Sequence, residues 1–370
     1  MLLTGCTPIN EDIPAQTGGA AVTVLPQEEA EDYVYSTLSP KEKQGYDMLA
    51  AAVRDFEPYV QFSEDFSEAE IKKLFTLVYT QESRIFWLDS IYSAPGENNI
   101  LSLSYRYTKE QSDSMRAQLE NTAGELLGRM PRNGDAYDKI KFFHDNIVTG
   151  CTFDNTSEYS NTAYGVLVDG RAQCEGYAFA MSYLCDLAGI ENYIANGRNS
   201  DGVAHAWNKI CADGNWYNVD CTWDDPKLKF SAPYFLRHDY MFVPDSDVEG
   251  TAYFSNTEYF PHIPCTSDEY NYFRREGLLF STAEDGIAAF EEQLKRTARS
   301  GGRDVELRFT DSGEYEKAKA QLFEEGGLKT VIEKLNGFYG CGIKTAHKSY
   351  NSKMYIIHIS IIYKNDDFSE

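Results

Sequence analysis

Residues 169–178 read Asp-Gly-Arg-Ala-Gln-Cys-Glu-Gly-Tyr-Ala, a turn signal that leads directly into an apolar run with helical spacing. Apolar side chains recur at three- and four-residue intervals after the cysteine, and Gly189 closes the run, which predicts a helix over residues 175–187. Cys174 then stands at the helix start, where free amides and the positive dipole end favour a thiolate. The neighbouring Glu175 opposes this effect slightly. The same amides would stabilise an oxyanion after attack on a carbonyl.

A histidine and an aspartate lie further along the chain in two strand-like runs, residues 204–211 and 216–223, joined through an Asp-Gly turn signal at residues 213–214. A two-residue loop places His205 and Asp220 on one face of this hairpin as diagonal neighbours. Diagonal Cα atoms are about 7–8 Å apart, within reach of an imidazole and a carboxylate. A four-residue loop preserves this arrangement, whereas a three-residue loop breaks it.

Together the three residues have the chain order and local settings of a thiol nucleophile, its base and the group that orients the base. Each residue alone has a simpler structural explanation: a small buried thiol, a strand histidine, or a carboxylate near a turn. The agreement of helix position, chain order and strand parity favours the catalytic interpretation. We therefore predict Cys174 as nucleophile, His205 as general base and acid, and Asp220 as the orienting residue.

Three sequence blocks around these residues resemble the transglutaminase-like superfamily, the papain-related cysteine enzymes. The blocks are residues 162–178, residues 204–208 with Ala-His-Ala-Trp-Asn, and residues 216–226, from Trp-Tyr-Asn-Val-Asp to Asp-Asp-Pro. The resemblance extends from near residue 115 to near residue 245. It implies an α+β fold with a papain-like or transglutaminase-like core, in which the nucleophile helix packs on an antiparallel sheet, and a Cys-His-Asp triad.

The chain departs from the animal tissue transglutaminases at the tryptophans that flank their active site. In that branch of the family, tryptophans upstream of the cysteine and just before the histidine supply an oxyanion donor and a substrate tunnel. Here residues 202–204 are Gly-Val-Ala, and the nearest tryptophan upstream of Cys174 is the distant Trp87. Because no tunnel that excludes water is evident, the sequence favours hydrolysis over crosslinking.

Other aromatic and polar residues near the blocks are candidates for supporting roles. Tyr164 and Gln173 are the candidates for a side-chain oxyanion donor, although Tyr164 is equally suited to be a packed aromatic residue of the preceding helix. Trp207 and Trp223, one after the histidine and one after the aspartate, are candidates for lining the cleft.

Three functional hypotheses follow from this pattern. The leading one is an exported cysteine hydrolase that cleaves peptide or isopeptide bonds through a thioester, with a protein or peptide substrate and a cell-wall peptide among the options. The second is a protein-glutamine gamma-glutamyltransferase, in which a lysine amine replaces water. The third is a non-catalytic surface binding scaffold. No cofactor is expected, and no metal site, because no His/Cys spacing suits zinc.

The charge balance of the chain narrows the choice of partners. There are 34 lysines and arginines against 58 aspartates and glutamates, a formal net charge of −24. Nucleic-acid binding is therefore disfavoured, because the phosphates would be repelled.

The N-terminus resembles the end of a bacterial lipoprotein signal, Met-Leu-Leu-Thr-Gly-Cys, with Cys6 as the lipidation site. Residues 7–32, rich in Gly, Pro, Ala, Thr and Glu, suit a disordered tether. A basic region and most of the apolar region of such a signal are missing, so we expect the start to be trimmed or wrongly placed. A chance Leu-Thr-Gly-Cys is the alternative. We expect an extracytoplasmic, membrane-anchored lipoprotein at the cell surface that contacts the membrane only through this anchor. No disulfide framework is inferred from the cysteines.

Four regions are predicted along the chain: the signal remnant and tether (1–35), an N-terminal α+β lead-in (36–110), the transglutaminase-like catalytic domain (111–262) and a small C-terminal α+β domain (266–370). The expected N-terminal and central helices cover residues 40–56, 67–82, 111–130 and 135–148, with a strand at 100–107. The C-terminal domain is expected to be ferredoxin-like, with strands at 277–280, 304–309, 342–350 and 353–363 and helices at 283–298 and 314–335.

Overall fold

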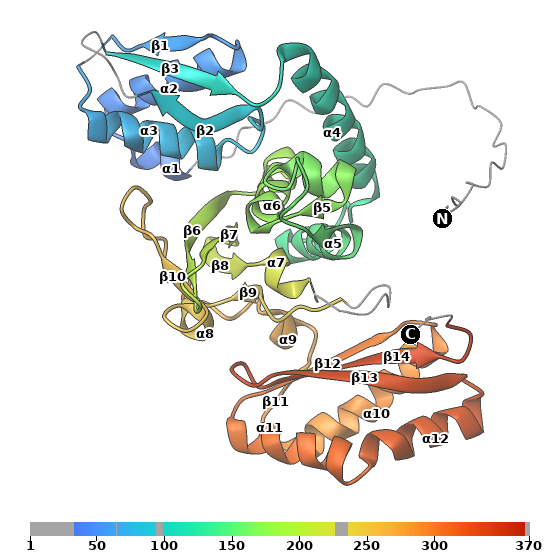
Figure 1. Ribbon diagram of the computed structural model, residues 1–370. Coiled ribbons are helices and arrows are strands. Elements are labelled where there is room, and N and C mark those ends of the chain that lie inside the picture. Colours follow the sequence, from blue (N-terminus) through green and yellow to red (C-terminus); the bar gives the residue numbers. More distant parts are fainter. Residues whose placement is uncertain (1–32, 64, 94–98, 226–235, 367–370) are drawn as a thin grey trace, which may run out of the picture.

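The computed structural model describes residues 33–63, 65–93, 99–225 and 236–366, which form an N-terminal, a central and a C-terminal unit one below the other (Figure 1). Cys6 and nearly all of the expected tether lie outside the described residues, so the lipoprotein interpretation stays a prediction. Among the described residues, no helix is long and apolar enough to cross a membrane.

The N-terminal unit packs helices against a small antiparallel sheet with strand order β1-β3-β2. Its elements are α1 (Tyr33–Thr37), α2 (Pro40–Arg54), β1 (Tyr59–Gln61), α3 (Glu68–Gln81), β2 (Leu88–Ser93) and β3 (Ile100–Tyr105). The predicted start of α3 is confirmed by a capping box, in which Ser67 accepts from the backbone N–H of Glu70 and the Glu70 carboxylate accepts from that of Ser67. The predicted alternation in β3 is also confirmed, with Leu101 and Leu103 buried.

The central unit holds a five-stranded antiparallel sheet with strand order β10-β6-β7-β8-β9, on which α6 packs. The strands are β6 (Asn192–Asn199), β7 (Ala204–Ala212), β8 (Asn215–Val219), β9 (Met241–Val243) and β10 (Tyr253–Ser255). The helices are α4 (Lys109–Arg129), α5 (Ala136–Gly150), α6 (Cys174–Ala188), α7 (Cys221–Asp224), α8 (Asp245–Val248) and α9 (Tyr272–Arg275). A π-helical turn, η1 (Gly165–Asp169), and a parallel pair, β4 (Thr152–Phe153) with β5 (Arg171–Ala172), precede α6. This mixed helix and antiparallel-sheet core agrees with the predicted fold class.

The hairpin β7–β8 has the predicted register. Its pairs run from Asn208 opposite Val219 to Ala212 opposite Asn215. The two residues left in the loop, Asp213 and Gly214, both have positive φ (48° and 79°), which is a type I′ turn. The parity argument made from the sequence is therefore confirmed, but the second strand ends at Val219, and residues 221–223 of the expected strand belong to α7.

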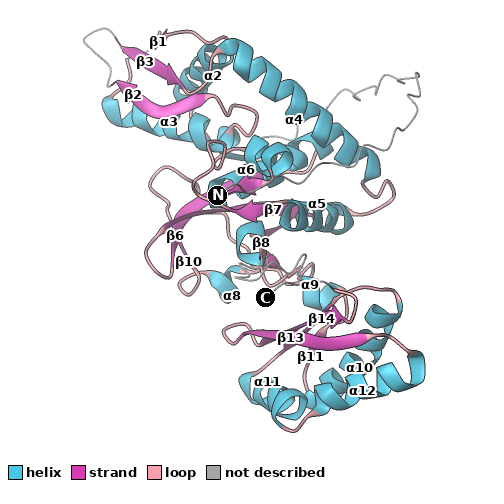
Figure 2. Ribbon diagram, turned by 45° about the vertical axis from the view of Figure 1, so that its right-hand side comes forward, coloured by secondary structure: helices cyan, strands magenta, loops and turns pink. Residues whose placement is uncertain are grey.

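The C-terminal unit differs from the ferredoxin-like expectation. Its sheet has the order β11-β12-β14-β13, with β11 and β12 parallel and the other neighbours antiparallel. All of its helices lie on the face turned away from the central unit (Figure 2). The elements are β11 (Leu279–Phe280), α10 (Ala283–Arg299), β12 (Asp304–Phe309), α11 (Ser312–Lys319), η2 (Ala320–Glu324), α12 (Gly327–Tyr339), β13 (Ile343–Asn351) and β14 (Ile356–Tyr363).

The prediction of a single helix over residues 314–335 in this unit is wrong, because the structure divides this segment into separate helices. The chain breaks at Gly326, which has a φ of 84°, in the left-handed region that glycine favours. A Cβ at Gly327 would lie 2.7 Å from the backbone oxygen of Gln321, so the turn also requires this second glycine. The result is α11 with η2, followed by a separate α12.

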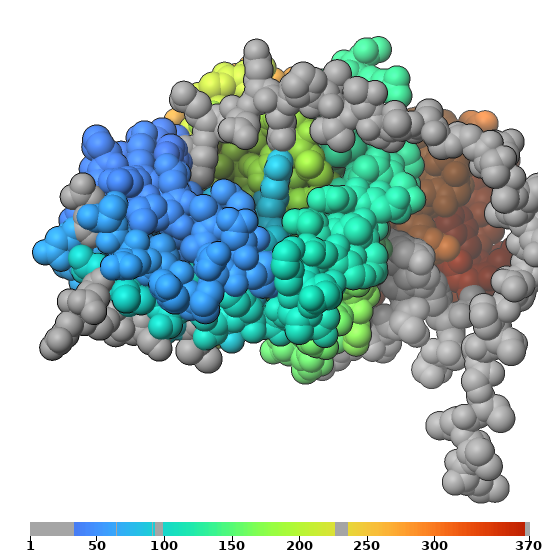
Figure 3. All heavy atoms as spheres, turned by 90° about the horizontal axis from the view of Figure 1, so that it is seen from above, coloured from blue at the N-terminus to red at the C-terminus, as the bar shows by residue number. Residues whose placement is uncertain are grey.

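Two clusters of buried apolar side chains form the cores of these units. One runs continuously through the N-terminal and central units, and the other fills the space between the C-terminal sheet and its helices. The N-terminal unit and α4 lie in front of the central unit when the molecule is seen from above (Figure 3). The Gln81 side-chain amide bonds both backbone groups of Ile194 on β6, at 2.9 and 3.1 Å, and Ser83 bonds Asp186 on α6. The predicted boundaries between the regions stay predictions.

Candidate active site

Cys174 is the first residue of α6, as the sequence predicts. The helix is buried from Gly176 to Cys185, while Cys174 itself is partly exposed. The loop before the helix crosses its first turn closely, because a Cβ at Gly176 would lie 2.4 Å from the backbone oxygen of Ser160. That same oxygen accepts a hydrogen bond of 2.8 Å from the backbone N–H of Gln173. The glycine in Cys-Glu-Gly thus allows the loop to fix the residue just before the thiol.

The hairpin brings His205 and Asp220 together. His205 Nε2 lies 2.6 Å from Asp220 Oδ2, and both side chains are buried. Asp220 also caps α7, because its Oδ1 accepts from the backbone N–H groups of Thr222 (2.9 Å) and Trp223 (3.1 Å). The predicted contact between imidazole and carboxylate is present in the structure.

The imidazole is arranged between the carboxylate and the thiol. Burial alone would lower the pKa of His205, but the charge and hydrogen bond of Asp220, together with a hydrogen bond to the Cys174 thiol, raise it to about 10. Because Nε2 is bonded to Asp220, Nδ1 is the nitrogen left for the thiol. A thiol at a helix start, beside an imidazole that retains its proton, is the environment in which cysteines become nucleophiles.

Residues 126–221 match the model of the transglutaminase-like superfamily, and this segment contains Cys174, His205 and Asp220. This central segment of the chain therefore resembles the core domain of the transglutaminase-like superfamily. It is 30% identical over 100 residues to human kyphoscoliosis peptidase and 29% identical over 100 residues to the mouse protein, covering 22% of this chain. The match spans only 15% of the length of these relatives. A solved transglutaminase (TGase) structure aligns with 44% of this chain and 50% of its own, at 16% identity and a TM-score of 0.27.

The aromatic residues of the transglutaminase-like core lie behind and beside the imidazole. Trp207 was expected to line the cleft, but it is only 1% exposed and bonds Asn218, so this prediction is wrong. Trp207 shares a face of β7 with His205 and packs parallel to it, with 6.0 Å between ring centroids. Trp223 is partly exposed and meets the imidazole edge-on at 5.8 Å, so it stays a candidate for lining the cleft.

The two oxyanion candidates of the transglutaminase-like core have different surroundings. The Tyr164 hydroxyl donates to Gln118 at 3.1 Å, and its ring packs against Tyr159 at 5.0 Å. These contacts support the packed-aromatic interpretation of Tyr164. Gln173 makes no side-chain capping bond and directly precedes Cys174, so it stays the candidate oxyanion donor.

Glu175, next to the thiol, is turned toward the N-terminal unit. Burial raises the pKa of its carboxyl, opposed by the charge of Arg106 and a hydrogen bond with Asn161. Arg106 in turn donates to Asn161 (2.6 Å) and to the Tyr79 hydroxyl (2.6 Å). A carboxyl with a raised pKa is less often charged and repels a neighbouring thiolate less. Glu175 therefore opposes a thiolate at Cys174 less than the sequence suggested.

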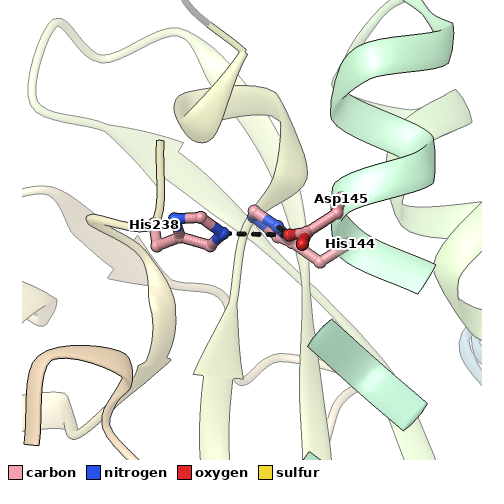
Figure 4. A group of neighbouring side chains, drawn as sticks. All are labelled: His144, Asp145 and His238. Atoms are coloured by element: carbon pink, nitrogen blue, oxygen red, sulfur yellow. Dashed lines mark hydrogen bonds and ion pairs between the residues drawn. The ribbon is translucent and has the colours of Figure 1, made fainter. Parts of the chain in front are cut away.

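A second cluster is formed by His144, Asp145 and His238 (Figure 4), and it reaches the C-terminal unit through Glu306 of β12, which bonds His238. His144 and His238 both approach Asp145 Oδ1, at 3.1 and 2.9 Å, and the three residues are close enough to share a metal ion. The other ring nitrogens bond Asp224 (3.0 Å) and Glu306 (2.7 Å). Since every ring nitrogen has a carboxylate partner, the cluster is complete as a hydrogen-bonded network. Sequence spacing missed it because its residues come from four separate elements or loops.

Proposed function

We propose that this chain is a cysteine hydrolase that cleaves peptide or isopeptide bonds. The observation that carries the proposal is the 2.6 Å contact between His205 Nε2 and Asp220 Oδ2, with the Cys174 thiol as the further hydrogen-bonding partner of the imidazole. The resemblance of the central segment to a superfamily that includes cysteine peptidases and transglutaminases supports an acyl-transfer reaction through this thiol.

In the proposed reaction, the Cys174 thiolate attacks the substrate carbonyl, and the amides at the start of α6 stabilise the tetrahedral oxyanion. The His205 imidazolium then gives its proton to the leaving amine as the C–N bond breaks, which leaves a thioester on Cys174. Water attacks the thioester and loses a proton to His205, and the acid product leaves as the thiolate is restored. Asp220 holds the imidazole in position throughout and stabilises its charge.

Water, rather than a lysine amine, is the proposed acyl acceptor. Val203, two residues before the histidine, is 59% exposed, so this position carries a small exposed side chain in place of a tryptophan. The lack of a tryptophan just before the histidine supports hydrolysis. Incorporation of a dansylated amine into a glutamine-containing protein would instead support the crosslinking alternative, and it would overturn this part of the proposal if it outpaced hydrolysis.

Alkylation of Cys174 by iodoacetamide, followed by peptide mass spectrometry, tests the catalytic assignment directly. Mass spectrometry is needed because Cys211 and Cys341 are also partly exposed. We expect Cys174 to react at pH 6, well below the ordinary cysteine pKa of about 8.5, and to lose this reactivity in His205→Ala. The same reaction at Cys211 serves as an internal control. A Cys174 that reacts only at alkaline pH, whether or not His205 is present, would favour the scaffold hypothesis.

The location of the protein is a separate proposal. We propose that Cys6 carries a lipid anchor outside the cytoplasm, which is supported by the residues around it and by their resemblance to a lipoprotein signal. Incorporation of an alkyne-tagged fatty acid into the wild-type chain but not into Cys6→Ser, in a bacterial host, is the expected result. Equal labelling of both chains, or of neither, would contradict the anchor.

A further inference from the structure

Tyr253 on β10 contacts the triad from outside the segment that matches the superfamily. Its side chain is fully buried, and its hydroxyl donates to Asp220 Oδ2 at 2.8 Å. This oxygen is also the one that bonds His205. Residue 253 lies beyond residue 221, where the family match ends, and no sequence motif near it points to a role.

The strand order explains how a tyrosine from β10 reaches the hairpin. β6 lies between β10 and β7, with Gly197 paired to both Ser255 and His205. Ser255 shares a face with Tyr253, which is itself paired with Asn199 of β6. The β6 residues paired with His205 and Trp207 on this face are Gly197 and Ala195, which leave room above the strand. A Cβ at Gly197 would lie 2.4 Å from the backbone oxygen of Phe254, so the close approach of β10 requires glycine.

The rings then form one stack across the sheet. Tyr253 packs parallel to Trp207 with 4.4 Å between centroids, and parallel to His205 at 5.7 Å. The stack restrains the plane of the imidazole, while the hydroxyl restrains the carboxylate that orients it.

Asp220 therefore has four donors from three directions. Two amides of α7 hold Oδ1, while the imidazole and the Tyr253 hydroxyl share Oδ2. Burial, and to a smaller extent the charge of Asp220, raises the pKa of Tyr253 well above its ordinary value. The phenol therefore keeps its proton and donates it to the Asp220 carboxylate in a hydrogen bond. Without this hydroxyl, Oδ2 would have the imidazole as its single partner, and rotation of the carboxylate would turn His205 away from the thiol.

We infer that Tyr253 is a positioning residue of the triad, which acts through Asp220 and His205 to keep the imidazole in contact with Cys174. The inference rests on the proposed function, because it assigns Tyr253 a role in forming the same thiolate–imidazolium pair. On this basis, β10, which follows the matched segment 126–221 in the chain, contributes a residue that positions the triad.

The test compares Tyr253→Phe with a matched control, Tyr217→Phe, on the full chain. Tyr217 is also fully buried in the same sheet, but its hydroxyl donates to Ser267 at 2.9 Å. The readout is the ratio of Cys174 alkylation rates at pH 6 and pH 9.5, because at pH 9.5 an accessible thiol reacts without help from an imidazole. We expect Tyr253→Phe to lower this ratio about tenfold, the effect of about one lost charge-assisted hydrogen bond, and Tyr217→Phe to leave it unchanged.

The outcomes separate this inference from the function on which it rests. If the wild type has high reactivity at pH 6 that His205→Ala removes, but Tyr253→Phe keeps the wild-type ratio, the positioning role is overturned and the triad stands. If the wild type itself lacks reactivity at pH 6, both are overturned. Gly197→Ala is a second variant, because its Cβ would push β10 away, and it should lower the ratio in the same direction; an unchanged ratio in this folded variant would count against the role.

Discussion

Two of the buried imidazoles that bond carboxylates, those of His205 and His238, differ in what lies on the second ring nitrogen. His205 has Asp220 on Nε2 and the Cys174 thiol as its further partner. His238 has Glu306 on Nδ1 at 2.7 Å and Asp145 on Nε2 at 2.9 Å. Only the first imidazole has a partner with which it can exchange a proton during a reaction.

This difference distinguishes a histidine–carboxylate pair with a catalytic role from one with a structural role. Burial opposes the charge on His238, yet Glu306 and Asp145 raise its pKa to about 9. Glu306 belongs to β12 of the C-terminal unit and Asp145 to α5 of the central unit. The His238 network therefore joins two units, whereas the His205 network orients a base. A raised histidine pKa alone does not identify an active site.

The largest expected effect comes from removing the proton-exchanging partner of His205. Cys174→Ala should lower peptide hydrolysis by about 10³-fold or more, because the nucleophile is lost. The free energy of unfolding should change little, since Cys174 is partly exposed. Hydrolysis rates and urea unfolding of the same preparations check both parts. Retention of substantial hydrolysis would move the chemistry away from this cysteine.

The second prediction breaks the other network. Glu306→Gln should destabilise the chain by about 3 kcal/mol, because it removes one of the two carboxylates that pair with the buried His238. Cys174 alkylation at pH 6 should be unchanged in the folded protein. Glu291→Gln is the control: its ion pair with Lys334 is exposed, so it should cost less than about 1 kcal/mol. If the two variants were equally stable, the network would have no role in joining the units.

The third prediction concerns pH. The folded pKa of His238, about 9, lies above its ordinary value of 6.5, so the stability from protonating this imidazole is fully present below pH 6.5 and is lost as the pH rises through 9. The difference in unfolding free energy between the wild type and Glu306→Gln should therefore shrink between pH 6.5 and pH 9.5. Urea unfolding at both values measures it, and a constant difference would contradict a protonated His238.

The smallest effect is expected at the hairpin that forms the His205 network. Gly214→Ala should cost about 1 kcal/mol, because Gly214 has a φ of 79° that an L-residue adopts with strain. The cost should appear in thermal unfolding, with the pH 6 reactivity of Cys174 retained. Gly128→Ala, in α4 where an added Cβ meets nothing within 4 Å, is the control and should not destabilise. Loss of reactivity in Gly214→Ala would show that the turn has a greater part in holding the triad.

The sequence was sufficient for the parts of the site that depend on local periodicity. Helical spacing located Cys174 at the start of α6, and the Asp-Gly turn set the parity that joins His205 to Asp220. The break at Gly326 was also readable, since adjacent glycines are a breaker signal that we passed over.

The contacts that the sequence did not predict join distant segments. Tyr253 reaches Asp220 across β6, and His238 bonds Glu306 from a separate unit. These pairings depend on strand order and on how the units dock, and neither has a sequence period. Trp207 was misassigned for the same reason, because the strand that covers it, β10, was not foreseen.

The pairing of Gln81 with Ile194 has a practical meaning for engineering. A glutamine side chain that donates to and accepts from one β6 residue imitates a neighbouring strand, and it shields a stretch of sheet margin that β10 does not pair. A shortened protein that starts at α4 would lose this shield and present bare backbone amides and carbonyls to other copies of itself. Such a fragment should self-associate in solution. The transglutaminase-like core should therefore be expressed together with the residues that precede it, because they cover the edge of β6.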